Sequence, residues 1–98
     1  MDEVKNMYYI YFLKSLKNNK YYIGRTSKLP IVRLSEHNLG SNTWTKHNSP
    51  FKLVYFEKYY CLQDGIQREK FYKSGFGKYI KKIIIEKIEN LRTHSSVG

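Results

Sequence analysis

The sequence predicts an α/β domain in which three helices cover a small three-stranded antiparallel sheet, in the order β-β-α-β-α-α. Three observations support this prediction. Two aromatic and β-branched runs, Tyr8–Leu13 and Tyr21–Gly24, flank the turn-forming pair Asn18-Asn19, as in a β-hairpin. A third run of the same kind follows at Phe51–Tyr60. The segments after the second and third runs instead have apolar residues at helical spacing.

The first run is apolar on both sides. Its two alternating sets of side chains are all aromatic or aliphatic: Tyr8, Ile10 and Phe12, and Tyr9, Tyr11 and Leu13. A strand with this pattern is usually covered on both faces of its sheet. We therefore expect helices above and below the sheet.

The hairpin admits two registers, and both place Tyr11 and Tyr22 on the same face. A two-residue turn on Asn18-Asn19 and a four-residue loop from Ser15 to Asn18 both preserve this parity. The longer loop makes the two tyrosines direct neighbours, whereas the shorter turn leaves them about 13 Å apart along the strand. Local rules leave this choice open.

The middle of the chain predicts one helix and a loop. Thr26-Ser27 supplies helix-starting hydroxyls and Pro30 suits a first turn, so a helix is expected from about Leu29 to Leu39, ending near Gly40. Residues 40–50 are mostly polar and are expected to form a loop, in which Trp44 is the one large apolar side chain.

The last part of the chain predicts two more helices. One runs from about Leu62 to Ser74, where Ser74–Gly77 breaks it. The other runs from about Lys78 to Leu91, with isoleucines and a leucine at helical spacing. A polar tail follows at 92–98. We expect a single domain over residues 1–98, with its core at about 7–91.

Composition favours a polyanionic partner. The net charge of +10 is spread along the chain rather than held in one tail. A basic surface that serves only solubility is the alternative.

No stretch approaches the ~20 apolar residues of a membrane span. The N-terminus has no signal-peptide pattern, and the single cysteine, Cys61, excludes an internal disulfide, so we expect a cytoplasmic protein.

Several blocks of the chain resemble a known family. Tyr9-Ile10-Tyr11 and Tyr22-Ile23-Gly24 resemble the paired signature of the GIY-YIG endonuclease superfamily. Later blocks are similar to those of its small single-domain members, in the right order: Arg33–Asn38, Pro50–Glu57 and Arg68–Lys70. The resemblance covers about residues 7–84. It implies a metal-dependent endonuclease that hydrolyses DNA phosphodiester bonds.

Glu69 is the most informative acid. The predicted buried stripe of its helix contains Leu62, Ile66 and Tyr72, and Glu69 lies within that stripe. An inward carboxylate must be paired, hydrogen-bonded or bound to a metal. The residues alone leave a structural ion pair as an equal alternative. The resemblance implies that Glu69 holds a single catalytic cation, Mg²⁺ or Mn²⁺.

The resemblance also implies roles for four other residues. Arg33 would neutralise charge on the scissile phosphate. His37, four residues later on the same helix, would contact the site. Tyr11 would activate the attacking water and Tyr22 would help to orient it. A tyrosine with a pKa near 10 is a poor base at neutral pH, so nearby cations would have to favour the phenolate.

Further cations are predicted to contact phosphate or DNA: Arg25, Lys46, Arg68 and Lys73. The chain departs from the family pattern at four places. The interval from Tyr22 to Arg33 is one residue longer than usual, around Pro30. Tyr9 replaces the first glycine of the signature, Gly65 stands where relatives often have alanine, and Lys81 or Lys82 stands where several relatives have asparagine.

The sequence identifies no element that would select a DNA sequence. We therefore expect recognition of duplex or branched DNA by its structure, or through a protein partner, in repair or recombination. Two other classes stay open. One is a non-catalytic nucleic-acid-binding module on the same scaffold, and the other is a basic domain that binds a protein or RNA assembly.

Overall fold

The computed structural model describes residues 7–97, with side chains as far as Leu91. Seven elements follow one another along the chain: β1 (Tyr8–Ser15), β2 (Tyr21–Thr26), α1 (Pro30–Asn38), α2 (Thr43–Asn48), β3 (Phe51–Tyr59), α3 (Leu62–Lys73) and α4 (Gly75–Val97).

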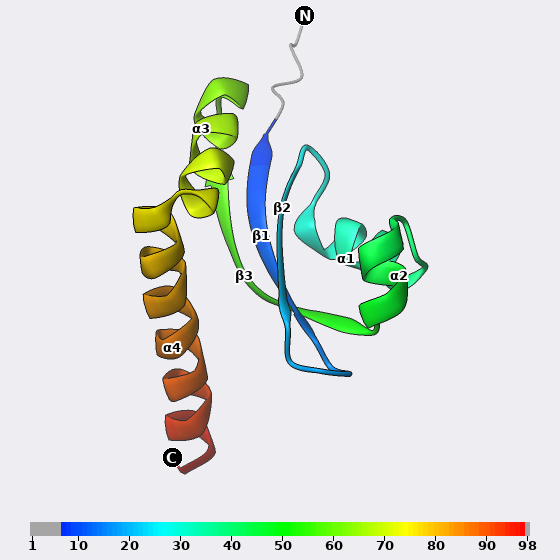
Figure 1. The fold of residues 1–98 in the computed structure, drawn as a ribbon, viewed down its shortest axis with the longest axis vertical. Coiled ribbons are helices and arrows are strands. Elements are labelled where there is room, and N and C mark those ends of the chain that lie inside the picture. Colours follow the sequence, from blue (N-terminus) through cyan, green and yellow to red (C-terminus); the bar gives the residue numbers. More distant parts are fainter. Residues whose placement is uncertain (1–6, 98) are drawn as a thin grey trace, which may run out of the picture.

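The protein has three layers, with the sheet in the middle (Figure 1). The strand order is β2-β1-β3, and β1 pairs antiparallel with both neighbours. Helices α1 and α2 lie on one side of the sheet, and α3 and α4 lie on the other. The predicted antiparallel sheet and α/β class are therefore confirmed. The described chain contains one more helix than expected, α2.

The hairpin uses neither of the two expected registers. Tyr11 lies opposite Gly24 and Leu13 lies opposite Tyr22. The loop still has four residues, but it spans Leu16–Asn19, because Ser15 remains in β1 and its N–H donates to the carbonyl oxygen of Lys20 at 2.7 Å. The parity argument holds, so Tyr11 and Tyr22 share a face as diagonal neighbours.

Each face of the sheet has its own hydrophobic core. On one face, Ile10 and Phe12 pack with Tyr72 of α3 and with isoleucines of α4. On the other face, Tyr11 and Leu13 pack with Phe51 of β3, and Leu34 of α1 covers them. The expectation that β1 is covered on both sides is confirmed.

Helix α2 was expected to be loop because its six residues have no apolar stripe. It begins at a reciprocal cap. The side chain of Asn42 accepts from the Thr45 N–H at 2.8 Å, and the Thr45 hydroxyl accepts from the Asn42 N–H at 3.3 Å. Such a cap satisfies backbone donors that would otherwise be unpaired at a helix start.

The last two helices are closer together than expected. Ser74 alone separates them, because its hydroxyl accepts the Gly77 N–H at 3.1 Å and so starts α4 at Gly75 rather than at Lys78. The predicted stripe of α3 is partly wrong: Leu62 is exposed, whereas Gly65 and Tyr72 are the buried residues. Helix α4 also continues to Val97, through most of the predicted polar tail.

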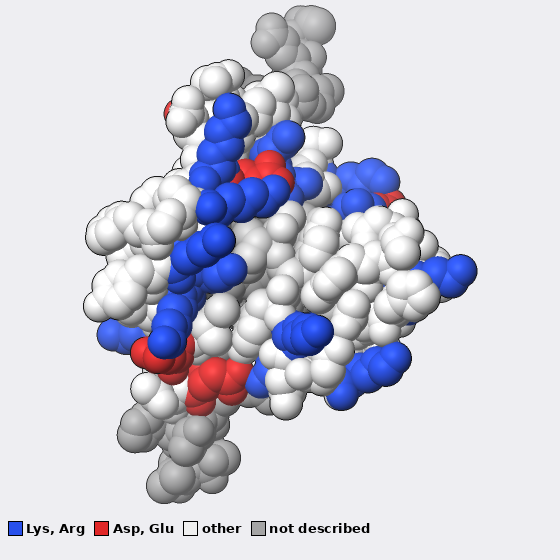
Figure 2. Space-filling model, in the orientation of Figure 1, with Lys and Arg blue, Asp and Glu red and all other residues white. Residues whose placement is uncertain are grey.

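Two surface features bear on function. Lys and Arg side chains form a column along α3 and α4 on the face shown in Figure 2. Among the helices that the structure describes, none combines the length and apolar character needed to cross a bilayer.

Candidate active site

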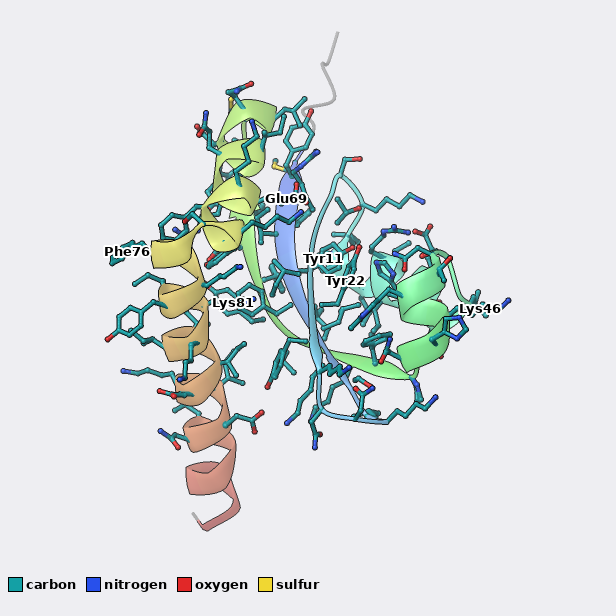
Figure 3. The ribbon with its side chains drawn as sticks, in the orientation of Figure 1. Tyr11, Tyr22, Lys46, Glu69, Phe76 and Lys81 are labelled. Atoms are coloured by element: carbon teal, nitrogen blue, oxygen red, sulfur yellow. The ribbon has the colours of Figure 1, made fainter. Side chains whose placement is uncertain are left out.

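Tyr11 and Tyr22 form the centre of the candidate site. Their rings lie on the same face of the sheet, 6.2 Å apart between centroids, and Figure 3 shows them side by side next to α1. Gly24 makes room for this arrangement. A Cβ at that position would lie 2.6 Å from Cζ of Tyr11 and 3.0 Å from Cε2 of Tyr22.

Helix α1 brings His37 against both tyrosines. The imidazole is fully buried, and its Nε2 lies 2.7 Å from the Tyr11 hydroxyl. Its Nδ1 lies 3.2 Å from the Ser41 hydroxyl. Its ring is 4.8 Å from the Tyr22 ring between centroids. His37 is therefore held on three sides.

The charge state of His37 decides the direction of these hydrogen bonds. Burial, followed by the positive charge of Arg33, lowers the pKa of His37 to about 4. The ring is therefore neutral at neutral pH. In the tautomer that suits both neighbours, Nε2 accepts the Tyr11 hydroxyl proton and Nδ1–H donates to Ser41.

Tyr11 is an un-ionised phenol in this environment. Burial, and then the neighbouring Tyr22, raise its pKa above the ordinary tyrosine value, while Arg33 opposes the shift through its charge and a hydrogen bond. For Tyr11 to act as the base expected from the sequence, nearby cations would have to lower its pKa and so favour the phenolate. Arg33 acts in that direction, but burial outweighs it.

Arg33 lies beside Tyr11 at the rim of the site. Its Nη1 donates to Glu36 at 2.7 Å and to the Ser41 hydroxyl at 3.4 Å. Lys28 also pairs with Glu36. With 26% of its side chain exposed, Arg33 can present its remaining N–H groups to a ligand.

Glu69 lies on the other face of the sheet, where it contacts Arg25 of β2. It belongs to α3, and its carboxylate accepts from Arg25 of β2 at 2.9 Å and from Lys73 at 3.4 Å. Its side chain is 23% exposed. Its charge also contributes to the raised pKa of Tyr11. The site therefore has two halves that meet at β2.

The chain was compared with known proteins. The model of the family described as GIY-YIG catalytic domain matches residues 7–83. These residues include all three strands, the helices α1 to α3 and the first part of α4. The chain belongs to the GIY-YIG family. No curated protein and no solved structure matched it. GIY-YIG catalytic domains are nucleases, so the match identifies a nuclease domain with DNA as its substrate class.

GIY-YIG nucleases generally depend on a divalent metal ion, and Glu69 fits such an ion by ligand type. Mg²⁺ is commonly held by one or two carboxylates, with waters and substrate phosphates as its other ligands. Within residues 7–97, no group of three His, Cys, Asp or Glu side chains converges. Among the residues singled out in the sequence, Glu69 is the carboxylate with the ligand type for such an ion, and its oxygens pair with Arg25 and Lys73.

Two of the predicted DNA-binding cations lie away from the two halves of the site. Arg68 is held by Glu57 through two hydrogen bonds, of 2.9 and 3.2 Å, and its guanidinium packs over Tyr72. Lys46 lies on the outer side of α2 in Figure 3, with its side chain against Gly40. Arg25 and Lys73 flank Glu69 directly.

The structure adds polar residues to the candidate site that sequence reasoning missed. Ser41 contacts His37 and Arg33, and Asn42 donates to the Tyr22 hydroxyl at 3.4 Å. No pattern marks Ser41, because its role comes from the chain's turn after α1. Asn42 could have been noticed as a helix N-cap residue.

Proposed function

We propose that this chain is a metal-dependent endonuclease that hydrolyses phosphodiester bonds in DNA. We further propose that it forms a single domain, recognises DNA structure and acts in repair or recombination. The observation that carries the proposal is the 2.7 Å hydrogen bond from the Tyr11 hydroxyl to neutral, buried His37, beside Arg33. Both side chains are buried, and a buried base aligned on a phenol beside a cation is an arrangement that is common at functional sites.

The hydrogen bond supplies a route for the proton of the attacking water. As water attacks phosphorus, its proton passes to the Tyr11 oxygen while the Tyr11 proton passes to Nε2 of His37. The water oxygen forms the new bond to phosphorus, and the leaving oxygen takes the electron pair of the broken bond. His37 holds the proton only until the leaving oxygen takes it up, because the lowered pKa of His37 disfavours the imidazolium. Tyr11 is never required to persist as a phenolate, which its raised pKa would make costly.

The other residues handle charge and orientation. Arg33 faces the phosphate oxygens and stabilises the charge that develops on them. Tyr22, held by Asn42, orients the water between the two phenols. Glu69 would hold the Mg²⁺ or Mn²⁺ ion, which supplies positive charge to the phosphate when bound. In that state Arg25 and Lys73 are free to contact DNA.

A non-catalytic nucleic-acid-binding module is the second candidate, and one observation favours it. Glu69 forms ion pairs with Arg25 and Lys73, as a carboxylate with a purely structural role would. In that case the nuclease scaffold would serve as a basic platform, and a protein partner would select the DNA. The two candidates differ in what happens when Glu69 loses its charge.

Branched, nicked and linear DNA incubated with Mg²⁺, Mn²⁺ or EDTA tests the proposal. We expect cleavage near branches with either metal and none with EDTA. Glu69→Gln should abolish cleavage, leave thermal stability nearly unchanged and keep or increase DNA affinity. If the chain is a binding module and Glu69 is only an ion-pair partner, the variant should mainly lose stability, and the wild-type protein itself should cut none of these substrates. Glu86→Gln, the same change at an exposed carboxylate on α4, is the matched control.

The proton route has its own test. Tyr11→Phe removes the hydroxyl and keeps the ring, so cleavage should fall while the melting temperature stays close to wild type. Tyr79→Phe makes the same change on a tyrosine that is 60% exposed, and should alter neither. Wild-type protein that binds DNA but cuts none of the three substrates with either metal would favour the binding module.

A further inference from the structure

A groove runs along the outer edge of β2, between α4 and α2. It has a volume of about 380 Å³. Its lining comes from four elements, β2, α2, α3 and α4: Tyr21, Tyr22, Ile23, Trp44, Tyr72, Lys73, Lys78 and Lys81. Because Tyr22 belongs to the candidate site and Lys73 contacts Glu69, the groove is continuous with the site.

One wall of this groove is cationic. Lys73 ends α3, and Lys78 and Lys81 follow on α4. In the part of the chain that the structure describes, Lys78 and Lys81 form no ion pair, and Lys73 has only a 3.4 Å contact with Glu69. Figure 3 shows Lys81 directed from α4 toward the sheet, and Figure 2 shows the cationic column of which this wall is part.

The opposite wall is aromatic. Trp44 of α2 stacks on Tyr22, with centroids 5.5 Å apart and planes at 28°. Trp44 also stacks on Phe51, with centroids 5.7 Å apart, and 37% of Trp44 remains exposed to a ligand. Tyr72 and Ile23 line the groove between the two walls, with no carboxylate among the lining residues.

We propose that this groove binds an unpaired strand of nucleic acid that leads away from the scissile phosphate. A single strand presents phosphates on one side and bases on the other, which matches one lysine wall and one aromatic wall. A duplex presents phosphates on both outer sides and would need cations on both walls. The inference rests on the proposed function, since it specifies which part of a branched DNA lies beside the site.

The only tryptophan of the chain, Trp44, lies in this groove, so its fluorescence can show whether a ligand occupies the groove. A base that stacks against Trp44 should quench its fluorescence. Titration with a twelve-residue oligothymidylate in EDTA should give saturable quenching. A blunt duplex of twelve base pairs should bind at least about tenfold more weakly to this site, because stacking contributes roughly 1–3 kcal/mol per base.

Lysine substitutions test the other wall. Lys78→Gln combined with Lys81→Gln should reduce the salt dependence of oligothymidylate binding by about 1.4 in the log–log slope, since each phosphate contact on a single strand contributes roughly 0.7. At 0.1 M salt this corresponds to a loss of affinity of roughly 25-fold. Lys82→Gln combined with Lys87→Gln removes the same charge from exposed positions of α4 outside the groove and is the matched control.

The outcomes separate this inference from the proposed function. Absence of quenching, equal quenching by the duplex, or equal effects of the two double variants would overturn the inference, even if the protein cleaves branched DNA. Selective quenching by the single strand would support it, even if no substrate is cut, because the titration in EDTA requires no catalysis.

Discussion

Gly24→Ala tests whether the position of the Tyr11 ring matters for activity. The added methyl group would lie 2.6 Å from Cζ of Tyr11, whereas an ordinary contact is at least 3.4 Å, so the ring must move by about 1 Å. The hydrogen bond to His37, now 2.7 Å, would then exceed hydrogen-bonding distance. A displacement of this size can lower a rate about 100-fold. The overpacking should cost about 1–3 kcal/mol of unfolding free energy.

Cleavage of branched DNA and thermal unfolding should be measured together on this variant. Gly75→Ala is the matched control, because a Cβ at that position meets nothing within 4 Å. It should retain full activity. If Gly24→Ala cleaves DNA at the wild-type rate, the Tyr11–His37 geometry has no role in catalysis, and the proton route is wrong.

Three further predictions concern stability. His37 should make the protein less stable as the pH falls from 6.5 to 4, because its folded-state pKa of about 4 lies below that of the unfolded chain, which therefore binds the proton first. The loss is about 3 kcal/mol at pH 4, and His37→Gln should abolish it while His47→Gln retains it. Glu57→Gln should cost about 1–3 kcal/mol in urea unfolding, since it removes the charged acceptor that Arg68 and Tyr72 share; a cost below about 0.5 kcal/mol would contradict this. Gly65→Ala should instead stabilise the protein by about 0.8 kcal/mol, because the added Cβ meets only ordinary contacts at 3.5 Å. A lower melting temperature would show that α3 has less room than these distances indicate.

The sheet and the position of its central strand could be predicted from the sequence. Tyr8–Ser15 is apolar on both sides, which only a covered strand explains, and the shared face of Tyr11 and Tyr22 follows from parity whatever the loop. The register itself could not be predicted. It depends on Ser15 and Lys20 closing the loop through the backbone, a choice that nearby turn residues do not determine.

The candidate site was only partly predictable for a similar reason. Motif positions identified Tyr11, His37 and Glu69, but their partners come from loops and from the far face of the sheet. Ser41 reaches His37 because the chain turns back after α1, and Arg25 reaches Glu69 because β2 presents it toward α3. Contacts of this kind depend on tertiary packing rather than on local spacing.

The outer edge of β2 has a consequence for the protein's behaviour in concentrated solution. An unpaired strand edge can template the addition of a strand from another molecule and so begin aggregation. Here Lys73, Lys78 and Lys81 lie along that edge, so a second copy would meet the same charges. The lysines that we assign to a nucleic acid would thus also keep free molecules apart. Removing them should leave the isolated protein prone to edge-to-edge association, with high salt producing the same tendency in the wild type.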